Sequence, residues 1–291
     1  MIVKFIGEVV PDQLQSASAV EVFNKQIYIA GDNINYIYLY SEKYSLLDKI
    51  KLFADADFNT QPKPVKKDWE AMSILNIPGR VPKLLLAGSG SKKVKRDFAI
   101  VMSLKSRKIN NIEHWPRYYN VVRKKLVDNE ELNIEGIAQV KDSLVLLNRG
   151  NLTGGNVIFV SPAKAAVAFS DVVHRIESAP LDIAGTKAGF TGAFYMEETD
   201  TLFYTAAAEL TTNAYLDGKV VGSAIGYFSN VSNRLTEANW VPDKQVAFHD
   251  ILEGKVESLT LLRKLDNKYV FLVVTDNDGA PGSMYELLIE L

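Results

Sequence analysis

The sequence predicts an all-β protein, a five-bladed β-propeller that is closed by its N-terminal strand. Three observations predict this fold. Short runs of β-branched and aromatic residues recur along the whole chain, helical periodicity is nearly absent, and one short motif returns five times. We expect residues 1–291 to form a single propeller domain, with blades at roughly 14–60, 66–128, 132–186, 188–250, and 254–291 plus 2–10.

Each blade is predicted from a pair of strand-like runs that follows one copy of the motif. In chain order the pairs are 26–30 with 36–40, 83–87 with 98–104, 143–147 with 156–160, 202–205 with 224–228, and 269–275 with 284–289. The best helical pattern is Arg117–Val127. By length alone six or seven blades would also fit, but five copies of the motif are present.

The last blade is predicted to be completed by the start of the chain. The first four units each have room for a fourth, outer strand, as at 45–52, whereas the fifth unit ends after three strands. The run Ile2–Val10 stands before the first unit and has no other partner in this scheme. We expect it to supply the missing outer strand, which closes the ring and removes a free sheet edge.

The composition excludes several classes of site. The 291 residues include 33 basic and 35 acidic side chains, so no charge excess favours nucleic acid or anionic lipid. The absence of cysteine excludes disulfides, thiol catalysis and cysteine-ligated metals, and three scattered histidines leave little room for a zinc site. No apolar run reaches membrane length, and Ile2–Val10 is too short for a signal peptide. We therefore expect no nucleic-acid or membrane partner and a cytoplasmic location, or a periplasmic or secreted one if a leader has been removed.

The repeated motif opens with an oxygen-bearing side chain and continues with a small residue. Its five copies are Ser18-Ala-Val-Glu-Val, Glu70-Ala-Met-Ser-Ile, Glu135-Gly-Ile-Ala-Gln, Thr191-Gly-Ala-Phe-Tyr and Glu257-Ser-Leu-Thr-Leu. The small residue would let the innermost strands of neighbouring blades approach closely around an axis. We expect the five leading side chains to crowd one mouth of a central channel.

A ring of these side chains has the chemistry of a calcium site. Three carboxylates, on Glu70, Glu135 and Glu257, would raise one another's pKa unless a cation lay among them. Ser18 and Thr191 complete an all-oxygen set that suits Ca²⁺ better than zinc. The alternative is that these side chains only hydrogen-bond to the backbones of neighbouring blades.

The chain also resembles the calcium-activated nucleotidases, or soluble apyrases. The segments that carry the resemblance are Ser18-Ala-Val-Glu-Val-Phe-Asn24, Asp68-Trp-Glu70 followed by Leu86-Ala-Gly-Ser-Gly90, His114-Trp115 with Tyr119-Asn-Val-Val-Arg123, Gly189-Phe-Thr191, and Val256-Glu-Ser258. The resemblance implies a five-bladed propeller with a calcium ion on its axis. It also implies Ser18, Glu70, Glu135, Thr191 and Glu257 as the ligands, which are the positions that the repeat marks independently.

The nucleotide site of that family is incomplete here. Its Pro-Arg-Arg stretch corresponds at best to Asn148-Arg149-Gly150-Asn151, and the charged run that follows it in the family is replaced by Leu152–Asn156. A phosphate-rich substrate would favour several arginines or lysines, so the resemblance does not by itself imply nucleotidase activity.

Polar loops between the second and third strands of each blade are expected to reach the same mouth. They make a plausible site for a small molecule, although solvated turns have the same composition. The candidate catalytic residues are Asp32, Arg149 and Glu209, with Asp32 or Glu209 as the base for a metal-activated water. The candidate substrate-binding residues are Ser89, Ser91, Lys92, Asn151 and Asp276.

Two functions follow from these observations. One is a calcium-dependent hydrolase that acts on a small phosphorylated or ester substrate at the channel mouth. The other is a non-catalytic propeller in which a structural calcium supports the binding of a ligand or protein.

Overall fold

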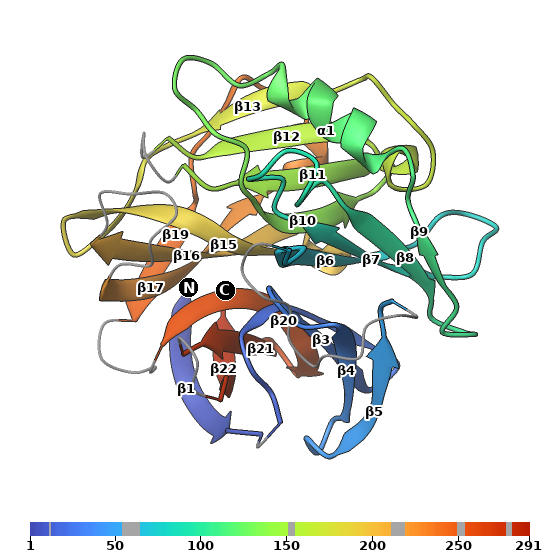
Figure 1. The fold of residues 1–291 in the computed structure, drawn as a ribbon. Coiled ribbons are helices and arrows are strands. Elements are labelled where there is room, and N and C mark those ends of the chain that lie inside the picture. Colours follow the sequence, from blue (N-terminus) through green and yellow to red (C-terminus); the bar gives the residue numbers. More distant parts are fainter. Residues whose placement is uncertain (12, 54–64, 151–154, 211–218, 249–253, 278–280) are drawn as a thin grey trace.

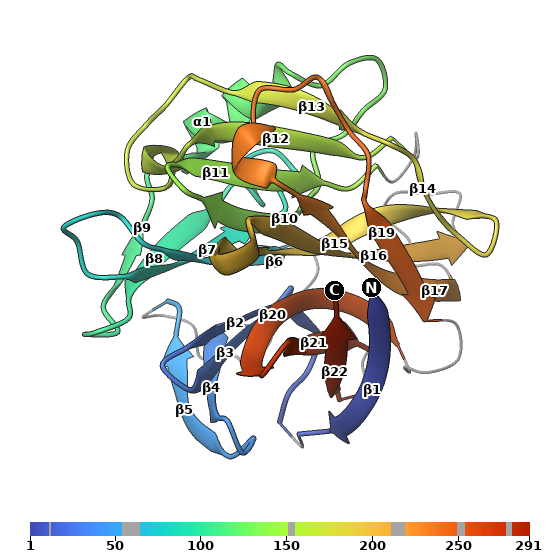
Figure 2. The ribbon, with the colours of Figure 1, turned by 180° about the vertical axis from the view of Figure 1, so that it is seen from behind.

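The computed structural model describes all residues except 12, 54–64, 151–154, 211–218, 249–253 and 278–280. Five sheets stand around a common axis, which Figure 1 shows nearly end-on and Figure 2 shows from behind. The predicted all-β, five-bladed propeller is therefore confirmed. No helix in these described ranges is long and apolar enough to cross a membrane.

The strands follow the predicted order, from the axis outward in most sheets. The first sheet contains β2 (Ala17–Phe23), β3 (Gln26–Gly31), β4 (Tyr36–Ser41) and β5 (Leu46–Lys51), and the second contains β6 (Trp69–Leu75), β7 (Lys83–Gly88), β8 (Ala99–Ser103) and β9 (Ile109–Asn111). The third contains β10 (Ile134–Val140), β11 (Ser143–Asn148), β12 (Val157–Pro162), β13 (His174–Ser178) and β18 (Asn239–Trp240). The fourth contains β14 (Leu181–Ile183), β15 (Thr186–Met196), β16 (Thr201–Leu210), β17 (Lys219–Ser229) and β19 (Lys244–Phe248). The fifth contains β20 (Lys255–Leu265), β21 (Lys268–Asp276), β22 (Met284–Glu290) and β1 (Ile2–Val9).

The N-terminal strand closes the ring, as predicted. β1 pairs antiparallel with β22 from Ile2 opposite Glu290 to Val9 opposite Met284. Figure 1 shows the two ends of the chain close together in this blade. Because β22 has β21 on its other side, this pairing leaves β1 as the outer edge of the fifth sheet.

Two features differ in detail from the expectation. The helix α1 spans Trp115–Arg123. It begins two residues before the start of the predicted run and ends four residues before the end of that run. Trp115 begins it because Pro116 suits the first turn of a helix. The third and fourth sheets also carry a fifth short strand each, β18 and β14. Three short 3₁₀ helices, at Ala163–Ala166, Glu197–Thr199 and Val231–Asn233, lie in the connections.

The core is divided into five apolar clusters, one in each space between neighbouring blades. α1 lies against the cluster between the second and third blades, where Trp115, Tyr118, Tyr119 and Val122 are buried. A propeller of this kind is stabilised by blade-on-blade contact, because each sheet buries both faces against its neighbours.

The small second residue of the motif does allow close approach of the innermost strands. A Cβ added to Gly136 on β10 would lie 2.9 Å from the carbonyl carbon of Gly192 on β15. A Cβ added to Gly192 would lie 2.7 Å from the Cα of Ser258 on β20. Neither position can therefore accept a side chain without moving the neighbouring strand.

Candidate functional site at the channel mouth

The five leading residues occupy the same structural position in all five blades. In every sheet the register between the innermost strand and the second strand shifts by one residue, and the extra residue is Ser18, Glu70, Glu135, Thr191 or Glu257. A β-bulge leaves its extra residue outside the ladder and changes the direction of its side chain. The repeat in the sequence therefore corresponds to a five-fold repeat of bulges, which lie near the start of the innermost strand in four blades and in the middle of β15 in the fourth.

Two of these side chains each have a buried oxygen without a hydrogen-bond partner among the described residues. Thr191 is 1% exposed and its Oγ1 has no partner, and Glu257 is 5% exposed and its Oε2 has none. Burying an unsatisfied polar atom costs about 1–3 kcal/mol. The ring thus has oxygen atoms whose bonding capacity the rest of the described structure does not use.

The other three differ in their surroundings. The Ser18 hydroxyl donates to the Ser16 carbonyl at 3.2 Å and accepts from the Asp32 amide at 3.1 Å, so it hydrogen-bonds to the backbone of its own blade and not to that of a neighbouring blade. Glu135 Oε1 accepts a hydrogen bond from Asn133 Nδ2 at 2.7 Å. Glu70 is half-buried on β6.

The carboxylates of the ring affect one another's protonation. Burial, followed by the charges of Asp68 and Glu135, holds the pKa of Glu70 well above its usual range. Burial raises the pKa of Glu257 to about 8, against the opposing effect of Lys255. This is the electrostatic strain that the sequence predicts for clustered carboxylates without a cation.

Two protein cations stand on one side of the ring. Lys255 Nζ lies 3.1 Å from Glu209 Oε1 and 3.1 Å from Glu257 Oε1. Arg149 reaches the same Glu209 oxygen at 3.0 Å and Glu135 Oε1 at 3.8 Å. Although burial raises the pKa of Glu209, Lys255 and Arg149 together lower it to about 2.

Gly189 makes room for this arrangement. A Cβ added to it would lie 2.3 Å from Arg149 Cγ, so the aliphatic part of Arg149 runs directly over the glycine backbone. The glycine of the Gly189-Phe-Thr191 segment is thereby explained by packing against a neighbouring blade.

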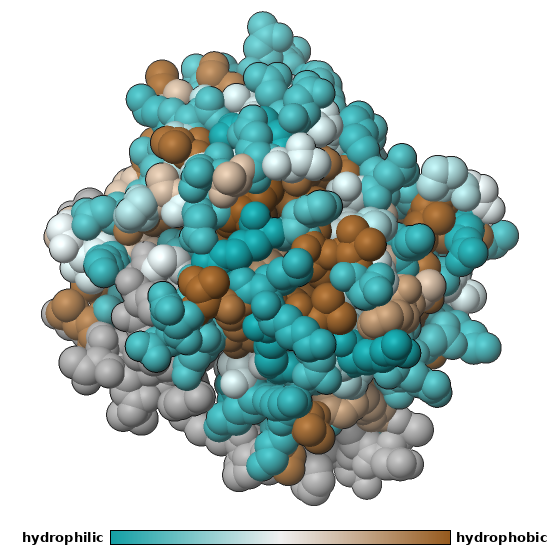
Figure 3. All heavy atoms as spheres, turned by 90° about the horizontal axis from the view of Figure 1, so that it is seen from above, coloured by the Kyte–Doolittle hydropathy of each residue, from teal (hydrophilic) through white to brown (hydrophobic). Residues whose placement is uncertain are grey.

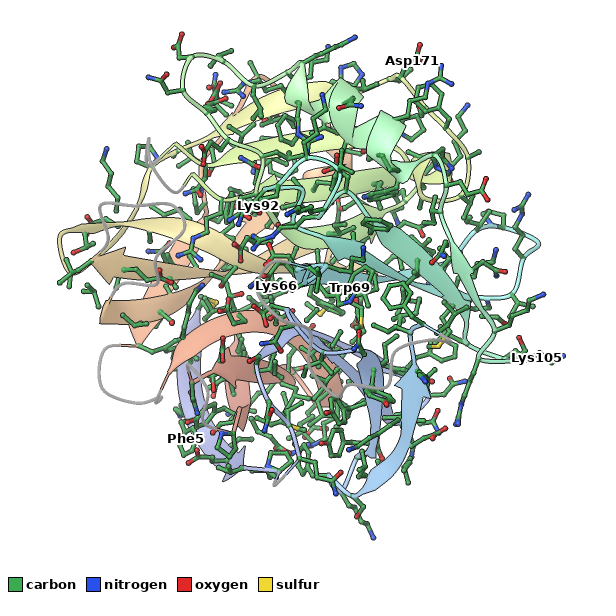
Figure 4. All side chains as sticks on the ribbon, viewed as in Figure 1. Phe5, Lys66, Trp69, Lys92, Lys105 and Asp171 are labelled. Carbon is green, nitrogen blue, oxygen red and sulfur yellow. The ribbon has the colours of Figure 1, made fainter. Side chains whose placement is uncertain are left out.

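A second charged group lies between the first two blades. Asp32, Asp68 and Glu70 each place one carboxylate oxygen within 4.8 Å of the other two. Lys66 contacts Asp32 and lies 2.8 Å from Asp68 Oδ1, and Arg96 reaches Asp68 Oδ2 at 2.6 Å. Figure 4 shows Lys66 and Trp69 near the middle of the ring, with Phe5, Lys105 and Asp171 toward its periphery.

The candidate substrate-binding residues lie in different parts of the structure. Ser89 and Ser91 lie at this second group, where both hydroxyls hydrogen-bond to Asp68. Lys92 follows them on an exposed loop, and Figure 4 shows it toward the middle of the ring. Asp276 pairs in register with Lys255 and is one of the charges that raise the pKa of Glu257. Asn151 lies outside the described residues.

Sequence reasoning missed four charged members of the site, namely Lys66, Asp68, Arg96 and Lys255. A signal for two of them exists, because Asp68 and Lys255 each stand two residues before a leading glutamate. The equivalent position holds Ser16 in the first blade and Asn133 in the third. Extending the repeat by two residues would have placed these polar side chains at the mouth.

The paired charges at the mouth leave a net deficit of positive charge. The groups joined by the ion pairs above or by the acidic cluster are six carboxylates, Asp32, Asp68, Glu70, Glu135, Glu209 and Glu257, and four cations, Lys66, Arg96, Arg149 and Lys255. When all ten are ionised, their sum is −2, which one divalent cation would neutralise. Figure 3 shows one side of the molecule, where hydrophilic side chains predominate and apolar side chains gather between them near the middle of the view.

Comparisons with known proteins bear on the fold and the family. Residues 13–289 match the model of a family of unknown function, DUF6929. No curated protein matches the chain significantly. A mutant of Cellvibrio cellulosa α-L-arabinanase is similar at a TM-score of 0.51 and 13% identity, covering 95% of this chain and 91% of that one. Myxococcus xanthus glutaminyl cyclase is similar at a TM-score of 0.51 and 8% identity, covering 99% and 97%. Identities this low show a shared propeller fold alone.

Proposed function

The chain belongs to the DUF6929 family of unknown function, and we propose that it is a calcium-binding β-propeller that holds the ion at the mouth of its channel. The observation that carries the proposal is the pair of buried oxygens without a partner, Thr191 Oγ1 and Glu257 Oε2, on equivalent bulges of a ring that also holds Glu70 and Glu135. A cation among these atoms would satisfy both oxygens and relieve the repulsion between the carboxylates.

The donor set supports calcium in particular. All the candidate ligands are oxygen atoms of carboxylates and hydroxyls, which hard cations prefer, and the described mouth offers no thiol or imidazole. Glu70, Glu135, Thr191 and Glu257 would hold the ion, and Ser18 keeps one lone pair to offer. The resemblance of the five motifs to the calcium-activated nucleotidases supports the same metal.

The surroundings of the ion favour binding over catalysis. The three candidate catalytic residues are engaged in ion pairs, because Asp32 contacts Lys66 while Arg149 and Glu209 contact each other. A carboxylate with a pKa of about 2 is a weak general base near neutral pH. We therefore propose that the ion and the surrounding polar loops bind a small molecule at the mouth and do not themselves transform it.

Hydrolysis is the second candidate, and the environment of Glu70 favours it. Glu70 is half-buried, and burial together with neighbouring carboxylates keeps its pKa well above the usual range. In this candidate Glu135, Thr191 and Glu257 would hold the ion, and the Glu70 carboxyl beside a calcium-bound water could accept or deliver a proton.

The test of the calcium proposal combines metal analysis with thermal melts. Protein stripped with EDTA should melt several degrees lower than protein given millimolar Ca²⁺, and Mg²⁺ should restore less. Thr191→Val removes only the unpartnered oxygen and Glu257→Gln removes only a charge, so both should reduce the shift. Glu21→Gln is the matched control, because Glu21 is a buried carboxyl on an innermost strand outside the ring of bulges. A calcium shift that persists in both ring variants would overturn the proposal.

The hydrolase candidate is tested by a turnover screen in the presence of Ca²⁺. Nucleotides, phosphate esters and aryl esters are the appropriate substrates. Calcium-dependent turnover that Glu70→Gln abolishes while calcium binding persists would establish catalysis over simple binding. Absence of turnover across all three classes would leave the binding function alone.

A further inference from the structure

Lys255 and Arg149 are two cations that lie beside the bulge residues Ser18, Glu70, Glu135, Thr191 and Glu257, which we call the axial ring. Each contacts one ring carboxylate and one carboxylate outside the ring. Lys255 Nζ is equidistant, at 3.1 Å, from Glu257 Oε1 and Glu209 Oε1. Arg149 lies 3.8 Å from Glu135 Oε1 and 3.0 Å from the same oxygen of Glu209.

Both cations are fixed in place. The Arg149 and Lys255 side chains are 9% and 19% exposed, and Arg149 is held against the backbone of Gly189. Glu209 Oε1 accepts contacts from both, so one carboxylate outside the ring binds the two cations together. The arrangement spans three blades, because Arg149 follows β11, Glu209 is on β16 and Lys255 begins β20.

These contacts divide the ring oxygens into two classes. Glu257 presents Oε1 to Lys255 and leaves Oε2 without a partner, while Glu135 presents Oε1 to Asn133 and Arg149. The protein therefore cancels part of the ring's negative charge and still leaves Glu257 Oε2 and Thr191 Oγ1 without a partner among the described residues. The four glutamates 70, 135, 209 and 257 together with the two cations sum to −2 when ionised.

We propose that Lys255 and Arg149, held by Glu209, set the charge of the cation that the axial ring accepts. This rests on the proposed function, a cation on the axis. With both cations present, a divalent ion would neutralise the summed charge of −2. Without Lys255 the local sum becomes −3, which matches a trivalent ion of similar size. Glu209 contacts both cations and contributes one of the four negative charges in this sum.

The test compares the affinities for Ca²⁺ and Tb³⁺, which have similar radii and the same preference for oxygen ligands. Tb³⁺ luminescence sensitised by Trp69, the neighbour of Glu70 on β6, reports its binding, and Ca²⁺ is measured by competition and by calorimetry. Lys255→Met keeps the stem and removes the charge. The control is Lys141→Met, because Lys141 contacts a single glutamate, Glu197, at 2.9 Å on the surface.

We expect Lys255→Met to raise the ratio of Tb³⁺ to Ca²⁺ affinity about tenfold or more. Loss of the ammonium group makes the site more negative by one charge, which attracts the trivalent ion more strongly than the divalent ion. Glu209→Gln removes a negative charge and should lower the ratio. Lys141→Met should leave it unchanged. An unchanged ratio in a folded Lys255→Met protein overturns the inference. If that variant does not fold, Glu209→Gln decides, and an unchanged ratio there overturns the inference as well.

The outcomes also separate this inference from the proposed function. Wild-type protein that binds neither ion, with a Lys255→Met variant that binds one Tb³⁺, would end the calcium proposal. It would support a charge-setting role, with Lys255 itself serving as the cation of the ring. Failure of every variant to bind either ion would overturn both.

Discussion

The hydroxyl of Thr260 on β20 donates a hydrogen bond of 3.1 Å to Glu21 Oε2 on β2, which joins the fifth blade to the first. Glu21 stands three residues after the leading Ser18, and Thr260 stands three residues after Glu257. Both side chains are buried, so the innermost strands carry a second layer of polar contact beyond the ring of bulges.

Glu21 makes the stability of the propeller depend on pH. Burial raises its pKa to about 8, so the folded state binds a proton that the unfolded state releases near pH 4.5. The stabilisation is fully present below about pH 4.5 and is lost as pH rises through 8. We expect Glu21→Gln to reduce the fall in the free energy of unfolding between pH 5 and pH 9 by a few kcal/mol, measured by urea denaturation. An unaltered pH slope would show that Glu21 stays ionised in the folded protein.

Calcium binding should release protons. The pKa of Glu257 is about 8, so this carboxyl retains a proton near neutral pH that a bound cation would displace, and the raised pKa of Glu70 acts in the same direction. The calcium affinity should therefore increase from pH 6 to pH 9. Calorimetry in two buffers with different ionisation enthalpies measures the number of protons released. Identical heats in both buffers would contradict the expectation.

Gly189→Ala should displace Arg149. The added Cβ would lie 2.3 Å from Arg149 Cγ, closer than carbon atoms can approach, and overpacking of this kind typically costs about 1–3 kcal/mol. We expect a loss of stability in that range together with weaker calcium binding. Gly7→Ala serves as the control, because its Cβ would meet nothing closer than 4.0 Å. Equal effects from the two substitutions would argue against a specific role for Gly189.

Removal of β1 should open the ring. Without residues 2–9, the outer edge of β22 would present unpaired amide and carbonyl groups. We expect a lower melting temperature and concentration-dependent association, measured by calorimetry and light scattering. Adding back a synthetic peptide of residues 1–10 should reverse the association. A truncated protein that melts and sediments like the full chain would show that closure is dispensable.

Much of the fold was predictable because its signals are local and repeated. The five bulge residues share residue chemistry and a small neighbour, so Ser18 and Glu257 can be aligned without any structure. The pairing of β1 with β22 was predictable from counting strands. The ends of α1 were less so, because Trp115 begins the helix two residues before the predicted run and is buried in the cluster between the second and third blades.

The charged partners at the mouth were harder to predict. That Glu209 holds both Arg149 and Lys255 depends on residues far apart in the sequence meeting across three blades. The loop position of Arg149 makes it a candidate catalytic residue, but in the structure it contacts Glu135 and Glu209 of the protein itself. Pairwise charge contacts of this kind follow from side-chain placement in three dimensions, which no local periodicity encodes.

The pairing of the first strand with the last also has a consequence for biosynthesis. β1 is synthesised before the strands of the other blades, whereas its partner β22 is synthesised after them. Earlier blades can assemble on one another as they emerge, while β1 must wait with its edge unprotected. The pairing of β1 with β22 also joins residues that are far apart in the sequence, and such non-local contacts slow folding. Chaperone dependence during synthesis should therefore concentrate on the N-terminal segment.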